Sequence, residues 1–324
     1  MRHVFSGLLI ALMAVTGCSS SGGMMGAGGS GGTGGGGSGG TGGGGTGGGG
    51  TGGSGGGASD PNVVTIQTQA FDVQPGGEVF MCQEFANPFG GADTEVSQID
   101  SDMTPGSHHM LLFFQPNATD TDVAACDPLQ FSTMLYGSQQ PHTSLPYPPG
   151  VAALIKGTQG FHMQMHYLNA TQNVIHAQVT ISFTKAMPGT ITQHAGVFFF
   201  DNISGIHVGA GQTTDVTTSC TFPVAANIMF ATAHTHKFTN TFGASIGANM
   251  IYQTNQWDNA PNQVYAPAIA VTAGTAISWT CNITNPNASG TLTFGESANT
   301  NDMCIFDGQY YPADDNNPNI TCMK

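Results

Sequence analysis

Five of the eleven histidines stand in three short groups whose residue types and spacing suit metal binding. The groups hold His108 with His109, then His166, then His234 with His236. Side chains two positions apart in a β-strand point to the same face, so His234 and His236 can converge on one ion. Imidazole is a ligand for zinc, copper, iron and nickel. The three groups therefore predict a metal site with histidine ligands.

The adjacent histidines set a condition on the backbone. Neighbouring side chains of a regular strand point to opposite faces, so His108 and His109 can share an ion only at a strand end or a β-bulge. His162 shares a strand face with His166, and we expect a structural role for it. The remaining histidines are expected to be ordinary hydrogen-bonded groups: His3, His142, His176, His194 and His207.

Short runs of β-forming residues, separated by Gly and Pro turns, fill the chain from about Asp60 to Lys324. Strands at this spacing are typical of β-sandwiches, and no run has the periodicity of an amphipathic helix. A break at Pro188-Gly189 divides the region into parts of sandwich size. The sequence predicts an all-β fold of two consecutive jelly-roll-like sandwich domains, residues 60–188 and 189–324.

The first 59 residues carry export and tether signals. Residues 1–17 join a basic start to a short apolar run, as in a signal peptide. The sequence Val15-Thr16-Gly17-Cys18 resembles a bacterial lipobox, which implies lipidation of Cys18 and anchoring to the cell envelope, at the outer membrane or cell surface. An ordinary signal peptide with an incidental cysteine is the alternative. Residues 18–59, almost all Gly, Ser and Thr, are expected to form a flexible linker.

The composition excludes nucleic acid as a partner. The chain has 5 basic and 19 acidic residues, so it lacks the clustered cations that a nucleic-acid binder needs.

The cysteine count favours disulfides. Besides Cys18 there are six cysteines, and an even number in an exported chain favours three disulfides, whose pairing the spacing leaves open. Zinc binding by these cysteines is not expected, since no C-x₂-C pair occurs.

The motifs also occur in a characteristic order. They are HHMLLF at 108–113, LPYPPGV at 145–151, QMHY at 164–167, HTH at 234–236, VYAP at 264–267, WTC at 279–281 and DMC at 302–304. In this order they resemble the copper type II, ascorbate-dependent monooxygenases, which include peptidylglycine α-hydroxylating monooxygenase and dopamine β-monooxygenase. The resemblance covers nearly all of the region from Asp60 onward.

The resemblance implies two copper ions per chain, one in each of two sandwich domains that face each other across a cleft. The implied electron-transfer site is His108, His109 and His166, with Gln164 beside it. The implied catalytic site, where O₂ binds, is His234, His236 and Met303. The implied disulfides are Cys82–Cys126, Cys220–Cys322 and Cys281–Cys304. The implied co-substrates are O₂ and ascorbate or another one-electron reductant. A thioether ligand such as Met303 favours Cu(I), and zinc rarely takes methionine.

The sequence departs from the peptide-processing members of the family at the substrate anchor. Thr232 replaces an arginine that stands two residues before HTH. Asp307 replaces a tyrosine four residues after the methionine, and Ile305 replaces an asparagine two residues after it. Peptide amidation is therefore not expected. An acid at position 307 favours a cationic or polyol substrate, and the choice between a small molecule and a peptide stays open.

Two other classes of protein compete with the enzyme. A copper-binding lipoprotein that sequesters or delivers the metal without turnover would keep the ligands and lose the substrate anchors. An adhesin-like sandwich with vestigial sites would bind no stoichiometric copper. Copper content and oxygen consumption distinguish the three.

Overall fold

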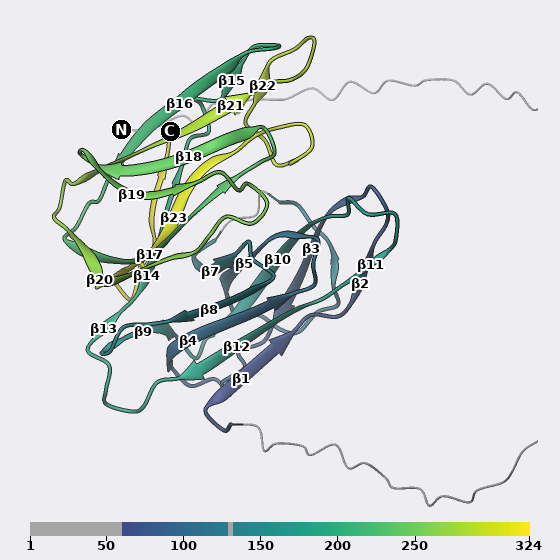
Figure 1. Ribbon diagram of the computed structural model, residues 1–324. Coiled ribbons are helices and arrows are strands. Elements are labelled where there is room, and N and C mark those ends of the chain that lie inside the picture. The colour runs from purple at the N-terminus through teal and green to yellow at the C-terminus, as the bar shows by residue number, and fades with distance from the viewer. Residues whose placement is uncertain (1–59, 129–131) are drawn as a thin grey trace, which may run out of the picture. The chain divides into compact units, whose positions relative to one another are not determined.

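Alternating buried and exposed residues produce an all-β chain in the computed structural model, which describes residues 60–128 and 132–324 (Figure 1). The strands of the first half are β1 (Val63–Gln67), β2 (Phe71–Val73), β3 (Glu78–Phe85), β4 (Thr94–Met103), β5 (Ser107–Pro116), β6 (Ala124–Ala125), β7 (Met134–Ser138), β8 (His142–Pro146), β9 (Val151–Ile155), β10 (Gln159–Leu168), β11 (Ile175–Ala177), β12 (Val179–Lys185) and β13 (Gln193–His194). Those of the second half are β14 (Gly196–Asp201), β15 (His207–Val208), β16 (Thr213–Thr221), β17 (Ala226–Thr235), β18 (Thr239–Ile246), β19 (Asn249–Thr254), β20 (Gln263–Val271), β21 (Ala276–Thr284), β22 (Leu292–Thr293), β23 (Cys304–Tyr311) and β24 (Ile320–Met323).

Two sheets enclose the core of the first half. One has the order β1-β12-β4-β9-β13, with β8 also paired to β4, and the other has the order β6-β3-β10-β5-β7. Strand β12 alternates buried Val179, Ile181 and Phe183 with more exposed residues, as a strand with one covered face should. Strand β10 is buried along nearly its whole length, because it lies at the centre of its sheet and both of its faces are covered.

The second half repeats this plan with a five-stranded sheet, β20-β17-β23-β14-β24, and a four-stranded sheet, β16-β21-β18-β19. Its core is rich in aromatic rings, among them Phe198, Phe200, Phe222, Trp279 and Phe306. Small two-stranded ladders, β11-β2 and β15-β22, complete the two halves. The predicted all-β class and sandwich layers are confirmed.

Three disulfides join Cys82 to Cys126, Cys220 to Cys322 and Cys281 to Cys304, and each lies within one half. These are the pairs that the family resemblance implied. Structural disulfides persist in oxidising compartments, so the protein belongs outside the cytoplasm.

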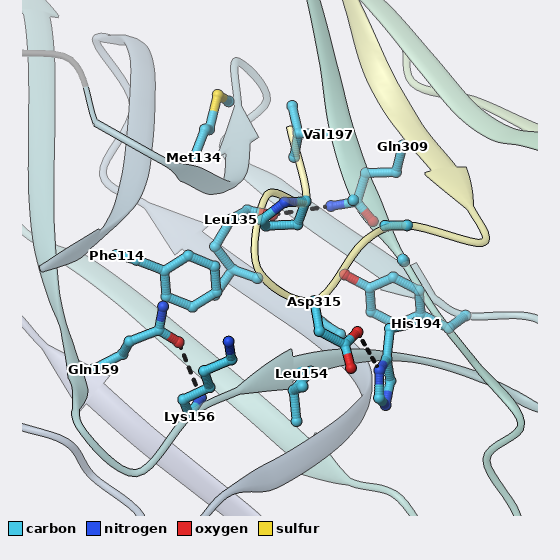
Figure 2. Close-up of a pocket in the computed structure, with 16 residues that line it drawn as sticks. Phe114, Met134, Leu135, Leu154, Lys156, Gln159, His194, Val197, Gln309 and Asp315 are labelled. Carbon is cyan, nitrogen blue, oxygen red and sulfur yellow. Dashed lines mark hydrogen bonds and ion pairs between the residues drawn. The ribbon is translucent and has the colours of Figure 1, made fainter. Parts of the chain in front are cut away.

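The two halves pack directly on each other within one compact unit. Met229 and Phe230 of β17 belong to the core of the first half. The Gln309 side-chain nitrogen donates a hydrogen bond to the Leu135 carbonyl oxygen at 3.1 Å, and His194 Nδ1 lies 2.7 Å from an Asp315 carboxylate oxygen (Figure 2). The cavity left at this junction is only about 30 Å³, room for about one water molecule and no substrate.

The expected signal peptide, the lipidated Cys18 and the linker at 18–59 lie outside the described residues. In the part of the chain that the structure describes, no helix is long and apolar enough to cross a membrane.

Candidate metal centre

The histidines of all three sequence groups meet in one buried cluster at the contact between the halves. The ring centroids of His108 and His109 each lie 4.7 Å from that of His234, and His108 lies 5.0 Å from His166 and 5.2 Å from His236. Nitrogen atoms of His108, His109 and His234 lie within 4.8 Å of one another, close enough to hold one metal ion. The residues expected to form two sites facing across a cleft are therefore in direct contact here.

A β-bulge allows both adjacent histidines to enter this cluster. His109 pairs with His166 across β5 and β10, but the next pair joins Ser107 to Tyr167. His108 is thus the extra residue of the longer strand. A bulge changes the direction of its side chain, which satisfies the condition that the sequence imposed.

The second half brings His234 and Met303 to one cavity. His234 of β17 pairs with Ile305 of β23, and Met303 directly precedes that strand. Met303 and His234 both line a cavity of about 170 Å³ that also reaches His109 and Gln164.

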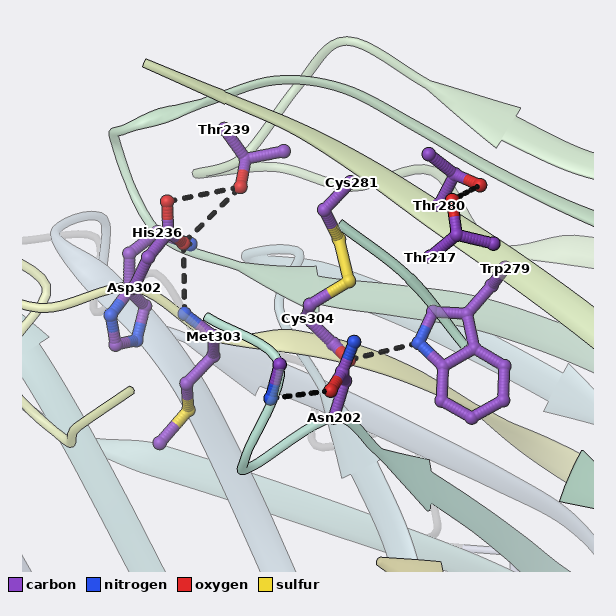
Figure 3. Close-up of a disulfide and its surroundings, with 11 residues drawn as sticks. Asn202, Thr217, His236, Thr239, Trp279, Thr280, Cys281, Asp302, Met303 and Cys304 are labelled. Atoms are coloured by element: carbon purple, nitrogen blue, oxygen red, sulfur yellow. Dashed lines mark hydrogen bonds between the residues drawn. A yellow bond between two sulfur atoms is a disulfide. The ribbon is translucent and has the colours of Figure 1, made fainter. Parts of the chain in front are cut away.

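Asp302 fixes the backbone at the methionine. One of its carboxylate oxygens accepts hydrogen bonds from the backbone N–H of His236 at 2.9 Å and of Met303 at 2.8 Å, and Thr239 donates to the same carboxylate (Figure 3). The next residue, Cys304, is held by its disulfide to Cys281. Met303 is therefore positioned from both sides before any metal binds.

Hydrogen bonds to three of the rings determine which nitrogen is available to a metal. Gln139 accepts from His234 Nδ1 at 2.8 Å, the Asn301 carbonyl accepts from His236 Nδ1 at 3.1 Å, and Glu78 accepts from His166 Nε2 at 2.9 Å. An oxygen acceptor requires the proton on the bonded nitrogen, so the other nitrogen carries a free lone pair.

The available nitrogens are all buried. Six ring nitrogens have no hydrogen-bond partner: Nε2 of His234 and His236, Nδ1 of His166 and His109, and both nitrogens of His108. Buried polar atoms are nearly always paired, so this concentration of unpaired nitrogens fits a missing ligand. Histidine ligands typically donate their second N–H to a carboxylate, an amide or a carbonyl, as three of these rings do.

Burial also keeps the imidazoles neutral. It lowers the pKa of His108, His109 and His234 well below the usual value, and the neighbouring rings lower them further. It lowers the pKa of His236 to about 4. Burial lowers the pKa of His166 as well, although Glu78 opposes the shift. A metal therefore meets neutral nitrogens at pH 7 without competition from protons.

His162 and Gln164 lie along the same strand as His166 but contact other groups. His162 Nδ1 lies 2.6 Å from a Glu84 carboxylate oxygen, and His162 is not part of the metal-binding group. Gln164 donates a hydrogen bond to the Pro128 carbonyl at 3.3 Å and lines the cavity beside His109.

No sequence pattern pointed to Gln139 or Glu78, because neither lies near a motif. Gln139, from the end of β7, accepts from His234 and donates to the Ala233 carbonyl, so it joins the first half to a ligand strand of the second. The Glu78 carboxylate accepts from His166, and also from Ser297 Oγ, the backbone N–H of Ala298 and Asn299 Nδ2. These bonds outweigh the effect of burial and lower the pKa of Glu78 to about 2. Only the tertiary structure identifies these two residues.

A second, larger cavity adjoins the cluster at His108. Its volume is about 560 Å³, and His108, Trp257, Lys237 and Asp258 are among its lining residues. The Trp257 ring centroid is 5.7 Å from that of His108. The cluster thus borders two cavities, one at His108 and one at His109 and His234.

Comparison with known proteins gives no family. No protein-family model and no curated protein matches the sequence. Among solved structures, the STIV MCP aligns at 7% identity over 77% of this chain and 97% of its own, with a TM-score of 0.37. PNGase F from Flavobacterium meningosepticum aligns at 12% identity over 81% of this chain and 98% of its own, with a TM-score of 0.39. The major capsid protein P2 of bacteriophage PM2 aligns at 7% identity over 76% of this chain and 96% of its own, with a TM-score of 0.32. Similarities this weak carry no argument about function.

Replacing Gln139 by leucine is expected to lower metal affinity about 10- to 100-fold, the usual loss when the partner of a ligating histidine is removed. Leucine leaves His234 Nδ1 without an acceptor, so the ring loses its fixed tautomer and orientation. Copper affinity measured with a competing chelator tests this. The adjacent Gln140→Leu variant keeps the bond between Gln139 and His234 and should match the wild type. Equal affinity in Gln139→Leu and wild type would show that the contact is irrelevant to the site.

Glu78→Gln is expected to reduce copper affinity by a similar factor of about 10 to 100. A single amide oxygen cannot accept from all four donors that the carboxylate now satisfies. Glu84→Gln is the matched control, because Glu84 lies on the same strand and bonds His162 outside the cluster. A loss of the same size in both variants would point to general destabilisation of β3.

Proposed function

We propose that this protein is a copper-dependent monooxygenase that hydroxylates a C–H bond with O₂ and an ascorbate-like one-electron reductant, using two copper ions. The observation that carries the proposal is the convergence of five neutral histidines, with six unpartnered ring nitrogens, in one buried cluster whose adjoining cavity Met303 lines. The protein would act on the outside of a bacterial cell envelope, held there by a lipid on Cys18.

The ligand types favour copper over other metals. Imidazole nitrogen suits both Cu(II) and Cu(I), and a thioether suits the softer Cu(I). Bound copper would supply one-electron transfer and activation of O₂. His108, His109 and His166 would hold one ion, and His234, His236 and Met303 the other. Six ligand residues are more than one four-coordinate ion uses, so the cluster supports a stoichiometry of two.

The chain itself would position the ions and the substrate. Gln139 and Glu78 fix the rings, Asp302 fixes the strand that bears Met303, and the buried surroundings exclude bulk water. The cavity of about 170 Å³ beside Met303, His109 and His234 offers space for a small substrate next to the ligands.

The same cavity favours catalysis over copper storage. A storage or delivery protein needs ligands and a path for the metal, but no cavity with apolar walls beside the thioether. The storage lipoprotein remains the second candidate, because the buried ligands serve it equally well.

Metal analysis and oxygen uptake together test the proposal. We expect the purified protein to bind about two copper ions and, with ascorbate, to consume O₂ faster than the same concentration of free copper. Two bound ions without protein-dependent uptake, across a panel of candidate substrates, would favour storage. Absence of bound copper would overturn both functions.

A further inference from the structure

Three carboxyl groups from separate parts of the second half line the cavity beside Met303. Asp201 ends strand β14, Glu296 lies in the loop after β22, and Asp307 lies on β23. The sequence pointed only to Asp307. The other two join it through the fold.

Strand register explains why Asp201 and Asp307 share a surface with the metal ligands. Across β14 and β23, Asp201 pairs with Ile305 and Phe199 pairs with Asp307. Strand β17 lies on the opposite edge of β23, and there His234 pairs with Ile305. Paired residues and residues two apart lie on one face of a sheet. Diagonal neighbours such as Asp201 and Asp307 are separated by roughly 7–8 Å.

Within residues 60–128 and 132–324, these carboxyl groups have no positive partner. One oxygen of each is buried without a hydrogen bond, and Asp201 is only 4% exposed. Among the described residues that line the cavity there is no lysine or arginine. Burial raises the pKa of each of the three to about 7. The negative charge of Glu296 further raises the pKa of Asp201, and that of Asp127 further raises the pKa of Glu296. A buried carboxylate without a counter-charge is unfavourable, so the cavity is suited to a cation supplied from outside the chain.

The rest of the lining shows what kind of cation fits. Leu111, Phe199, Ile203, Phe294 and Ile305 form apolar walls. A hard metal ion such as Ca²⁺ needs six to eight oxygen ligands, which these walls do not offer. An ammonium group can form charge-assisted hydrogen bonds to a carboxylate while its carbon chain packs on the apolar side chains.

We propose that this cavity binds an aliphatic diamine or polyamine, whose two or more ammonium groups pair with Asp201, Glu296 and Asp307. A single ammonium would leave other carboxyl groups unpaired, whereas a four-carbon diamine places its two charges at a separation close to that of Asp201 and Asp307. Such a ligand would lie beside Met303, His109 and His234. The inference rests on the proposed function only in treating this ligand as the substrate.

Binding to the metal-free protein tests the proposal independently of turnover. Isothermal titration would compare 1,4-diaminobutane, butylamine and 1,4-butanediol, which differ in charge but hardly in length. We expect the diamine to bind at least about ten times more tightly than butylamine, and the diol not to bind measurably. Equal affinity for the two amines, or no binding by the diamine, would overturn the proposal whatever the variants do.

Two substitutions locate the binding site. Asp307→Asn and Asp201→Asn should each reduce affinity for the diamine about tenfold, toward that for butylamine. Asp258→Asn is the control, because Asp258 is exposed and lines the other cavity. A loss in the control equal to that in the two variants would show nonspecific attraction to an acidic protein and overturn the assignment. Diamine binding by a protein that takes up no copper would leave this inference standing and remove the proposed monooxygenase.

Discussion

Replacing Met303 by isoleucine is expected to abolish protein-dependent oxygen consumption. The change removes the thioether but keeps a side chain of similar size, and Asp302 and the Cys281–Cys304 disulfide still hold the backbone. We expect the rate to fall by more than about 100-fold, beyond the usual 10- to 100-fold loss when only a partner of a ligand is removed. An oxygen electrode with ascorbate as reductant measures the rate.

The control for this variant is Met163→Ile, which alters a fully buried methionine in the core of the first half. A swap of similar volume costs less than about 1.5 kcal/mol of stability and should leave oxygen uptake unchanged. Copper content must also be measured in both variants, because the rings of His234, His236 and His166 are held by Gln139, Asn301 and Glu78 and not by Met303. Full uptake by Met303→Ile would remove the methionine from the site and favour a reaction at the histidines alone.

Copper is expected to raise the melting temperature by about 8–16 °C. The ligands of each ion come together only in the folded chain, so bound copper stabilises the folded chain relative to the unfolded one. Free copper at about 1,000 times its dissociation constant adds about 4 kcal/mol. For a domain of this size each kcal/mol corresponds to about 2–4 °C. Differential scanning calorimetry with and without a copper chelator measures the difference.

Variants of single histidines show whether the stabilisation arises at the cluster. His234→Ala should lose a clear part of it, because His234 is a proposed ligand whose ring also lies against those of His108 and His109. His207→Ala, at an exposed position on β15, should keep it. Equal copper-induced shifts in the two variants would place the stabilising ion elsewhere on the protein.

The sequence by itself determined the features that depend on local periodicity and residue chemistry. Alternating apolar residues and Gly/Pro turns required strands, as in β12, because a two-residue period can cover only one face of a sheet. The order of the histidine motifs and Met303 selected the candidate ligand residues, and the adjacent pair His108-His109 already required a bulge or strand end if both were to share one ion.

Only the tertiary structure decided how these residues meet. That the three histidine groups form one cluster depends on packing between halves, in which Met229 and Phe230 enter the core of the other half. Gln139 and Glu78 reach the rings from positions 95 and 88 residues away in sequence. No local pattern encodes contacts over such separations, because they arise from strand register and from the burial of two cores against each other. The three carboxyl groups of the cavity follow the same rule: the residue types were visible in the sequence, and the fold alone brought them into the cavity that His109, His234 and Met303 line.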